Sequence, residues 1–372
     1  MRIGIILTGD YSWAGGVYYS LNIIKLLQKI SQVKNINVVV FVNKHTQAEL
    51  LSEIDLKNVE VIDLDNKSFF YKLWCKTAGF ILGINYRFVK DINAARLDLL
   101  YPLSQYEKGH KRLNCRVFYW LYDFQHKFLP ALFSKEEREK RDLNFKQVVD
   151  NANDLVVSSC DSADHLKQFY PEYAGKTHVY NFVSLIPATG TKLNLKVPEN
   201  FLVVCNQFWP HKNHLTVLKA IDLLVRENKK IHVVFTGKYD FGPAREYVNE
   251  LRAFIDENKL NEYITFTGFI AREEQVELIR RSKAVLQPSL FEGWSTVVED
   301  AKALNKFLLV SDIPIHREQI TQDVLFFKPD DARELSEYIN TVFQKEKKIT
   351  ETDYSKNIQK SGSDLQEIFG IH

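Results

Sequence analysis

Short runs of Val, Ile, Leu and Phe alternate with longer helix-forming stretches along the chain, and this alternation constrains the fold more than any other feature. The runs are nearly continuous, which is typical of strands that helices cover on both faces. The expected strands are 3–7, 38–42, 59–62, 97–101, 117–121, 155–157, 202–205, 232–235, 264–266, 284–287 and 307–310. The expected helices include 18–30, 214–227, 243–258 and 273–282. The alternation predicts an α/β protein with doubly wound parallel sheets.

A segment without helical period divides the chain into two similar halves. It covers 183–200 and carries Pro187, Gly190 and Pro198, which are typical of loops. A length of 372 residues also fits two domains. We expect Rossmann-like domains over 1–185 and 186–350 that face a cleft, and a helix within 351–372 that packs back on the first domain. A ligand is expected at the carboxyl ends of the strands.

Composition excludes some classes of function and location. The 49 basic and 47 acidic side chains nearly balance, so bulk charge gives no case for a nucleic-acid partner. The four cysteines lie too far apart for a zinc motif, so free thiols in a reducing compartment are expected; they are Cys75, Cys115, Cys160 and Cys205. The first apolar run is too short for a signal peptide, and no run is long enough for a membrane span. By elimination we expect a cytoplasmic protein.

Two loops that follow expected strands carry residues suited to an anion. Gly15 and Gly16 allow backbone N–H groups to approach a phosphate or sugar closely, or they only make a tight turn. Lys212 directly precedes an expected helix, where a cation suits a bound phosphate, although a solvated lysine is the alternative. His211 and His214 have no carboxylate nearby in sequence, so they are weak metal candidates.

The densest pattern is Pro-Ser-Leu-Phe-Glu-Gly-Trp-Ser-Thr-Val-Val-Glu-Asp, which follows an expected strand. Ser295 or Thr296 is a candidate cap of a new helix, and the amides around 293–297 would then form an anion site. Glu292 and Asp300 bracket that site. Phosphates between two sugar-binding carboxylates indicate a nucleotide sugar. Alternatively, Glu292 is a helix cap and Asp300 is a surface charge.

This pattern resembles the donor-binding signature of retaining glycosyltransferases of family 4, which have the GT-B fold. The family has Glu, seven residues and a second Glu; here Glu292 is followed by Asp300 at the second position. Glu299 lies one position too early and would point off the helix face that Asp300 occupies. The resemblance continues through 235–237, 266–270 and 311–318, and so covers most of 200–330.

The resemblance implies a role for each matched residue. Glu292 would contact hydroxyls of the donor sugar, Asp300 the ribose, and Lys212 the diphosphate. Gln207 stands where the family commonly has Arg, so charge stabilisation would rest on Lys212 and on helix amides. The backbone at Phe269 would hold the base. The full set of expected donor-binding residues is Gly15, Gly16, Gln207, Lys212, Gly237, Phe269, Ile270, Glu292, Gly293, Trp294, Ser295, Thr296 and Asp300.

A loop of the first half, 120–130, resembles an acceptor-side loop of some of these enzymes. Tyr122 occupies the position where many members have His, so His126 becomes the candidate for contacting the acceptor or the sugar. Asp123 would orient His126 or the acceptor hydroxyl. The alternative is a helix cap and a hydrogen-bonded loop histidine. With Glu292 and Lys212, His126 and Asp123 complete the expected catalytic set.

The resemblance implies transfer of a hexosyl unit from a UDP-, GDP- or dTDP-sugar to a glycan or lipid-linked glycan, with retention and without a cofactor or metal. Bacterial surface polysaccharide or lipopolysaccharide assembly is the expected setting. Asp63-Leu-Asp65 superficially matches the metal motif of another glycosyltransferase fold, but loop carboxylates at this spacing are common. A sugar-nucleotide epimerase and a non-catalytic sugar-binding protein are the alternatives.

Positive charge concentrates in 66–116, which holds ten Lys or Arg against Asp91, Asp98 and Glu107. The same segment contains Phe69, Phe70, Tyr71, Trp74, Phe80, Tyr86 and Phe88. Basic residues mixed with aromatic ones suit an anionic membrane surface near a lipid-linked acceptor. The alternative is that the aromatic residues are core and the lysines form a solvated face.

Overall fold

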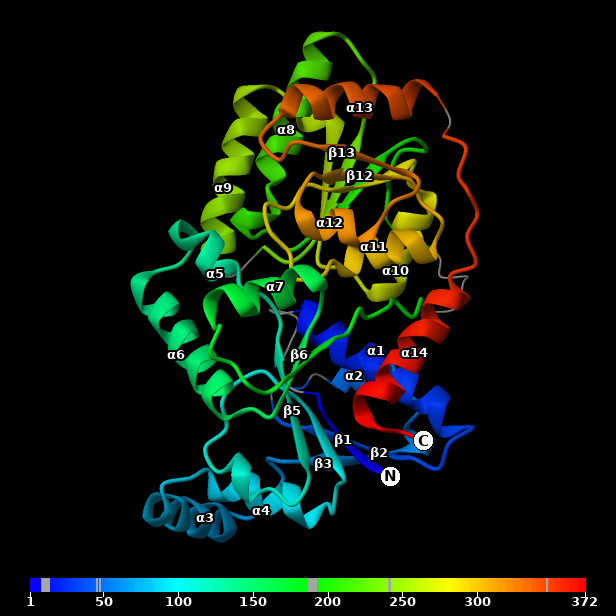
Figure 1. The fold of residues 1–372 in the computed structure, drawn as a ribbon. Coiled ribbons are helices and arrows are strands. Elements are labelled where there is room, and N and C mark those ends of the chain that lie inside the picture. Colours follow the sequence, from blue (N-terminus) through cyan, green and yellow to red (C-terminus); the bar gives the residue numbers. More distant parts are fainter. Residues whose placement is uncertain are drawn as a thin grey trace. The chain divides into compact units, whose positions relative to one another are not determined.

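The computed structural model describes residues 1–7, 14–44, 46, 48–186, 193, 195–239, 242–345 and 347–372. The chain divides into two compact units, shown in Figure 1. Unit 1 comprises Met1–His126, Phe133–Val183 and Lys356–His372, and unit 2 comprises Lys127–Leu132 and Ser184–Ser355. From the sequence we expected the first domain to end at residue 185 and the second at residue 350.

Unit 1 is built on a seven-stranded parallel sheet in the order β3-β2-β1-β4-β5-β6-β7. Its strands are β1 (Arg2–Ile6), β2 (Asn37–Val42), β3 (Val59–Asp63), β4 (Leu99–Leu103), β5 (Arg116–Leu121), β6 (Asp154–Val157) and β7 (Lys176–Val179). The helices are α1 (Ala14–Ser31), α2 (Ala48–Ser52), α3 (Phe69–Leu82), α4 (Tyr86–Ala94), α5 (Gln125–Phe128), α6 (Lys135–Asn151), α7 (Cys160–Phe169) and α14 (Ser355–Phe369). The last two residues of α5 and the first of α14 belong to unit 2. From α14, Phe369 packs against Tyr101 and Phe118, and Ser361 donates a hydrogen bond to Tyr180.

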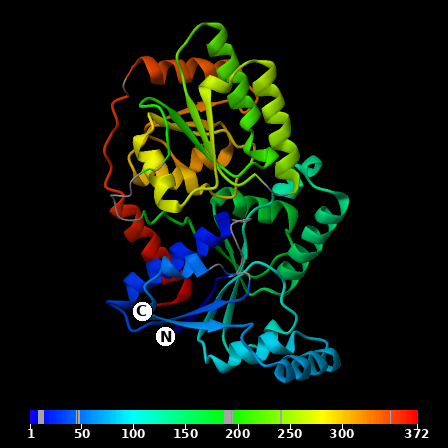
Figure 2. The same cartoon turned by 180° about the vertical axis from the view of Figure 1, so that it is seen from behind.

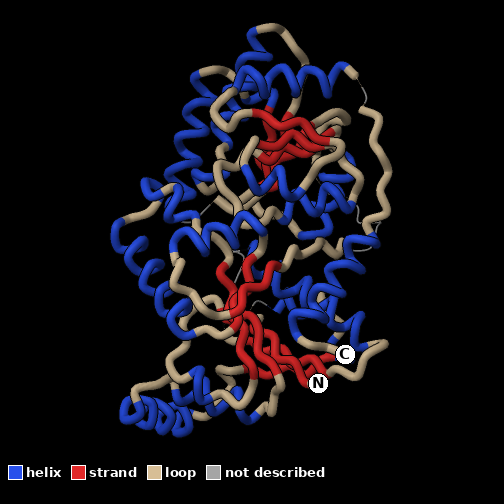
Figure 3. The backbone as a smooth tube through the Cα atoms, viewed as in Figure 1, coloured by secondary structure: helices blue, strands red, loops and turns tan. Residues whose placement is uncertain are grey.

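Unit 2 is built on a six-stranded parallel sheet in the order β10-β9-β8-β11-β12-β13. Its strands are β8 (Leu202–Cys205), β9 (Val233–Thr236), β10 (Ile264–Gly268), β11 (Ala284–Gln287), β12 (Leu308–Ser311) and β13 (Val324–Phe327). The helices are α8 (His214–Arg226), α9 (Gly242–Glu257), α10 (Arg272–Arg281), α11 (Thr296–Ala303), α12 (Pro314–Gln319) and α13 (Ala332–Gln344). Figure 3 shows helices on both sides of the sheet in each unit.

The predicted fold class is confirmed, because both units are doubly wound parallel sheets. Every expected strand is present within about two residues. In each unit the chain starts in the middle of the sheet and reverses direction across it, so β1 lies beside β4 and β8 beside β11. Ligands of such sheets bind outside the carboxyl ends of the strands at this reversal.

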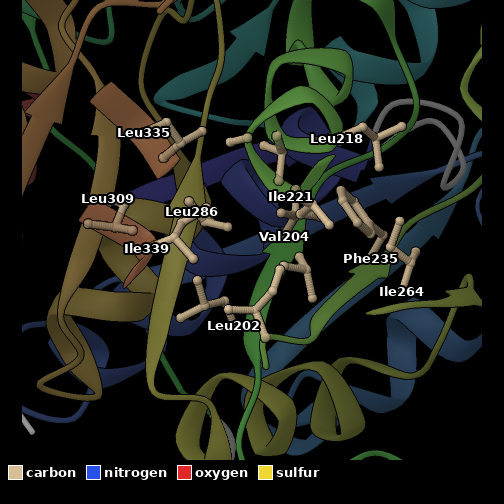
Figure 4. Packing of buried hydrophobic residues seen from close by; sticks show 14 of the residues in the cluster. Leu202, Val204, Leu218, Ile221, Phe235, Ile264, Leu286, Leu309, Leu335 and Ile339 are labelled. Carbon is tan, nitrogen blue, oxygen red and sulfur yellow. The ribbon is translucent and has the colours of Figure 1, made fainter. Parts of the chain in front are cut away.

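Apolar strands of unit 2 are buried between helices on both faces, as their continuous apolar runs predict. One layer of this core, shown in Figure 4, joins the five strands β8 to β12 to α8 and α13. Its labelled side chains are Leu202, Val204, Leu218, Ile221, Phe235, Ile264, Leu286, Leu309, Leu335 and Ile339. The other face is covered by a second cluster that includes Cys205, which is buried as predicted.

All four cysteines are free thiols in the structure, in agreement with their spacing. Within the described ranges, no helix is both long enough and apolar enough to cross a bilayer.

Candidate functional site

The loops that follow β8 and β11 meet at the reversal of strand order in unit 2. The Leu290 N–H donates to the carbonyl of His211 over 2.8 Å, which ties the two loops together. Closer to the sheet, Asn206 Nδ2 donates to Gln287 Oε1 over 2.9 Å. Asn206 is the first residue after β8 and Gln287 is the last of β11. The place where the fold favours a ligand is therefore lined by polar groups.

Lys212 and Glu292, predicted from separate motifs, form an ion pair at this place. Lys212 Nζ lies 2.5 Å from Glu292 Oε1. The same oxygen accepts hydrogen bonds from Gln287 Nε2 (2.8 Å) and Ser289 Oγ (2.7 Å). No hydrogen bond from any residue that the structure describes reaches the other oxygen, Oε2. The Lys212 and Glu292 side chains are 16% and 10% exposed, so the pair is sheltered but still in contact with solvent.

The charge of Glu292 is stabilised despite its sheltered position. Burial by itself would raise the pKa of the carboxyl, but attraction to Lys212 and His211 and hydrogen bonds from Lys212 and Ser289 outweigh burial, so its pKa is lowered. The result is a carboxylate at neutral pH in which Oε1 has three hydrogen-bond partners and Oε2 has none among the residues that the structure describes. Such a group can accept hydrogen bonds from hydroxyls of a ligand.

Polar residues that the sequence analysis did not single out support this pair. Gln287 Nε2 also donates to Ser289 Oγ over 3.1 Å. Ser311, the last residue of β12, donates from Oγ to the Ser289 carbonyl. His316 of α12 is completely buried, and its Nδ1 lies 2.8 Å from the Ser311 carbonyl. The signal that could have found Asn206, Gln287 and Ser311 is a polar side chain that ends an apolar run.

Asp300, the second acid of the motif, lies in a closed environment. It is 0% exposed, and Arg272 of α10 donates from Nη1 to Oδ2 and from Nη2 to Oδ1. Ser184 donates from its hydroxyl to Oδ1 as well. The alternative of a surface charge is therefore wrong. A ribose hydroxyl would have to replace one of these partners, so the ribose contact of Asp300 stays a prediction.

The start of α11 is capped as expected but only partly open to an anion. Ser295 accepts a hydrogen bond from the Val298 N–H through its side chain, which confirms it as the N-cap. The Ser295 N–H, however, donates to Gln319 Oε1 over 3.1 Å. The expectation that all amides of 293–297 face a ligand is therefore wrong for Ser295. Gly293 is buried, and Trp294 and Thr296 are half-buried.

Glu299 points away from Asp300, as the helix spacing predicts. It is buried and accepts hydrogen bonds from Lys302 Nζ (2.7 Å) and Gln319 Nε2 (3.0 Å) through Oε1. The hydroxyl of Tyr354 donates to its Oε2 over 2.5 Å. The same tyrosine oxygen accepts from the Ser184 N–H over 3.0 Å.

Gly237 has a packing role at the end of β9. A Cβ atom at this position would lie 2.1 Å from the Asn206 carbonyl oxygen, and its φ of +152° is unfavourable for other residues. The Gly237 N–H donates to the Gly268 carbonyl over 3.0 Å. Gly237 therefore allows the loops after β8, β9 and β10 to approach one another, and its contact with a donor stays a prediction.

The other expected residues of this edge lie on the same loops. Gln207 Oε1 accepts a hydrogen bond from Trp209 Nε1 over 3.2 Å. Phe269 is 46% exposed, whereas Ile270 is half-buried and packs on the core. Their predicted contacts with a diphosphate and a base are not tested by the geometry.

In unit 1, Gly15 and Gly16 begin α1 as predicted, but residues 8–13 before them lie outside the described residues. The side chain of His126 is 1% exposed, and its Nε2 lies 2.9 Å from Asp142 Oδ1. Burial lowers the pKa of His126, although the nearby Asp142 opposes that shift. Contact between this side chain and an acceptor is therefore blocked in the structure, and the hydrogen-bonded histidine of the alternative is what it shows.

Asp123 is bonded within its own loop. Its Oδ1 accepts from the Gln125 N–H (3.0 Å) and lies 3.4 Å from Arg141 Nη1. The carboxylate that holds His126 is Asp142, so the prediction that Asp123 orients His126 is wrong. The alternative role of Asp123, orientation of an acceptor hydroxyl, stays a prediction.

The weak metal candidates have other partners. His214 is completely buried and stacks on Phe208 with ring centroids 4.5 Å apart. Asp63 Oδ1 accepts from the Asp65 N–H, and Asp65 Oδ1 lies 3.2 Å from Arg87. Over the described ranges, no three His, Cys, Asp or Glu side chains cluster in a way that suits a metal ion.

Comparison with solved structures defines the class of fold. Sucrose-phosphate synthase from Thermosynechococcus elongatus superposes with a TM-score of 0.71 at 16% identity, over 99% of this chain and 95% of that one. HepE of Anabaena, in complex with UDP and glucose, superposes with a TM-score of 0.64 at 18% identity, over 100% of this chain and 95% of that one. At these identities the likeness shows the fold alone. The chain has the two Rossmann-like α/β units of GT-B structures.

Comparison of sequences relates part of the chain to a family of enzymes. Residues 188–361 match the family described as glycosyl transferases group 1. O-antigen chain mannosyltransferase RfbU of Salmonella typhimurium is 27% identical over 155 residues, which is 40% of this chain and 40% of that protein. The matched family range contains Lys212, Glu292 and Asp300. The resemblance to glycosyltransferases is thereby confirmed for this part of the chain.

Proposed function

We propose that the protein is a retaining glycosyltransferase that transfers a hexosyl unit from a nucleoside diphosphate sugar to an acceptor hydroxyl. The observation that carries this proposal is the Lys212–Glu292 pair at the strand reversal of unit 2, within the range that matches group 1 glycosyl transferases. A cation for phosphates and a carboxylate for sugar hydroxyls are joined there within 2.5 Å.

The donor would replace contacts that the pair now makes internally. Lys212 would turn from Glu292 to the diphosphate, whose negative charge grows as the sugar leaves. Glu292 would keep Gln287 and Ser289 on Oε1 and accept sugar hydroxyls at Oε2. Gln287 and Ser289 thus hold the carboxylate in place while its cation is shared with the ligand.

In the proposed reaction, the bond between the anomeric carbon and the diphosphate oxygen breaks, and the acceptor oxygen bonds to that carbon on the same face. The acceptor proton passes to the departing diphosphate, which keeps the bonding electron pair. Lys212 stabilises the charge on the leaving group, so no strong protein base is required. The residues suited to this chemistry need no metal ion in the proposed mechanism.

We propose a glycan or lipid-linked glycan as the acceptor, in bacterial surface polysaccharide or lipopolysaccharide assembly on the cytoplasmic face of the membrane. The likeness to an O-antigen mannosyltransferase supports this setting. The acceptor and the sugar are the parts of the proposal that rest on relatives instead of on geometry.

A donor panel tests the proposal. UDP-, GDP- and dTDP-sugars are added singly in a thermal-shift assay, and the sugar that stabilises the protein is then used in a transfer assay with a lipid-linked glycan. Lys212→Ala and Glu292→Ala should abolish transfer and keep a folded protein. The exposed Lys219→Ala on α8, the helix that follows Lys212, serves as the matched control and should retain transfer.

Other results would contradict the proposal. Near-normal transfer by both variants would remove the pair from the mechanism. Conversion of a donor without any acceptor would indicate an epimerase. Absence of stabilisation by every nucleotide and nucleotide sugar would indicate a non-catalytic protein of this fold.

A further inference from the structure

Helix α3 of unit 1 exposes an unusual amount of apolar surface. Phe69, Phe70 and Phe80 are 72%, 81% and 91% exposed, and Ile81 is 75% exposed. Leu73 and Trp74 are about half exposed. We call these six residues the α3 apolar face. Adjacent exposed apolar side chains of this size mark an interaction site.

Helix geometry gathers these side chains on one side of α3. At about 100° per residue, Phe69, Leu73 and Phe80 form one stripe along the helix. Phe70, Trp74 and Ile81 form a second stripe next to it. Cys75, the one buried residue of α3, lies on the opposite side. The helix is therefore apolar on two faces, and only one of them is used for packing in unit 1.

Contacts on the opposite side hold α3 in this orientation. The hydroxyl of Tyr71 donates to Asp91 Oδ1 of α4 over 2.6 Å. Gly79 lies so close to the next turn that a Cβ atom would be 2.9 Å from the Ile84 carbonyl oxygen. Gly83 ends the helix in the left-handed conformation. Figures 1 and 2, which view the molecule from opposite sides, both show α3 beside α4 at the edge of unit 1.

The surroundings of the α3 apolar face are positively charged. Residues 66–90 carry five basic and no acidic side chains: Lys67, Lys72, Lys76, Arg87 and Lys90. Lys72 and Lys76 border the Phe69 stripe in the helical order. Lys90 lies over the Trp74 ring, 4.1 Å from its centroid, on the other border. Cations therefore flank an apolar strip on both sides.

We propose that the α3 apolar face docks on an anionic lipid bilayer, with Phe and Ile side chains in the acyl boundary and lysines at the headgroups. An apolar strip flanked by lysines is complementary to such a surface in both polarity and charge. The exposure of Phe69, Phe70 and Phe80 excludes the alternative that they are core. This docking is independent of the glycosyl transfer proposed above.

Vesicle binding tests the docking without any nucleotide sugar. The full chain is mixed with vesicles of phosphatidylglycerol and phosphatidylcholine in equal parts, and bound protein is separated by sedimentation. Phe70→Glu/Phe80→Glu should weaken binding about a hundredfold or more, because two inserted side chains become charged. Val33→Glu/Leu143→Glu is the matched control: it makes the same charge change at two exposed apolar residues of unit 1 and should bind almost like the wild type.

Charge and depth are tested separately. Lys72→Gln/Lys76→Gln should weaken binding at low salt by about fivefold for each lysine, and this difference should shrink at high salt. Brominated lipids should quench Trp fluorescence in the wild type, and much less in Trp74→Phe. Transfer to a water-soluble acceptor should be unaffected by Phe70→Glu/Phe80→Glu, so failure of docking and failure of the proposed function are distinguishable.

Three results would overturn the docking. The first is absence of binding to anionic vesicles at low salt. The second is equal loss of binding in Phe70→Glu/Phe80→Glu and in its matched control. The third is a lipid-free dimer that these Phe substitutions dissociate in sedimentation velocity, because the face would then be covered by a second copy of the chain.

Discussion

Lys212–Glu292 and Arg272–Asp300 are two ion pairs of unit 2 whose acids belong to one motif, yet they differ in their exposure to solvent. Lys212 and Glu292 are 16% and 10% exposed, whereas Arg272 and Asp300 are 6% and 0% exposed. Among the described residues, Oε2 of Glu292 has no hydrogen-bond partner, while both oxygens of Asp300 have partners. A carboxylate with an unpartnered oxygen is suited to a ligand, and one with partners on both oxygens is suited to holding helices together. The spacing of two acids therefore does not assign them equal roles.

The largest effect expected concerns stability. Arg272→Met leaves Asp300 as a buried charge without its cation, so the free energy of unfolding should fall by about 3–5 kcal/mol. Urea unfolding measures this change. Lys212→Met should cost much less, because solvent reaches its partner.

A double variant controls for the loss of packing in that experiment. Arg272→Met/Asp300→Leu removes both charges and should recover most of the lost stability. If Arg272→Met unfolds at the same urea concentration as the wild type, the Arg272–Asp300 pair does not stabilise the fold. The proposed difference between this pair and the Lys212–Glu292 pair would then be wrong.

The next effect concerns activity. Glu292→Gln keeps the shape of the side chain but removes its charge, so turnover should fall by about a hundredfold with little change in stability. Asp300→Asn should show the reverse pattern, with a clear loss of stability and a smaller loss of turnover. Steady-state kinetics and urea unfolding of both variants provide the comparison. If both variants lose turnover and stability to the same extent, Glu292 and Asp300 do not have the different roles inferred here.

A smaller effect is expected from pH. Because the pKa of Glu292 is lowered in the folded protein, its carboxylate stabilises the fold at every pH above the pKa of the unfolded chain. That stabilisation is lost as the pH falls through the lower, folded pKa. Urea unfolding at a series of acidic pH values should therefore show a steeper loss for the wild type than for Glu292→Gln. Identical slopes would mean that Lys212 does not stabilise the carboxylate.

The smallest effect is expected from restoring a family feature. Gln207→Arg places a cation on the loop after β8, where the resemblance expects one, and should tighten the binding of UDP or GDP by at most about tenfold. Calorimetry measures the change, with Lys219→Arg as a control for added guanidinium charge. Weaker binding would show that the bond between Gln207 and Trp209 is needed for the shape of the loop.

Much of the fold was predictable because the strands are continuous apolar runs. Strands β7 and β13 were not expected, and their burial explains why the prediction of strands was incomplete. In β7 only His178 is buried, and its Nε2 lies 2.9 Å from Asp154 Oδ1. Three of the four residues of β13 are half-buried. Edge strands of this kind bury less apolar surface and have a weaker sequence pattern.

The site was predictable in part. Lys212 and Glu292 follow neighbouring strands, so fold topology alone brings them together. The partner of Asp300 was not predictable, because Arg272 is 28 residues away and reaches it only after α10 and α11 have packed. For α3, the helix is apolar on two sides, so the pattern alone does not tell the buried side from the exposed one.

Gly237 limits how this protein can be redesigned. Any added side-chain carbon there would collide with the Asn206 carbonyl and push Asn206 from Gln287, which in turn supports Glu292. A laboratory library that seeks new sugar preferences gains nothing by varying position 237. Variation is better directed at Phe269, whose side chain is 46% exposed, and at the half-buried Trp294, while Gly237 is kept.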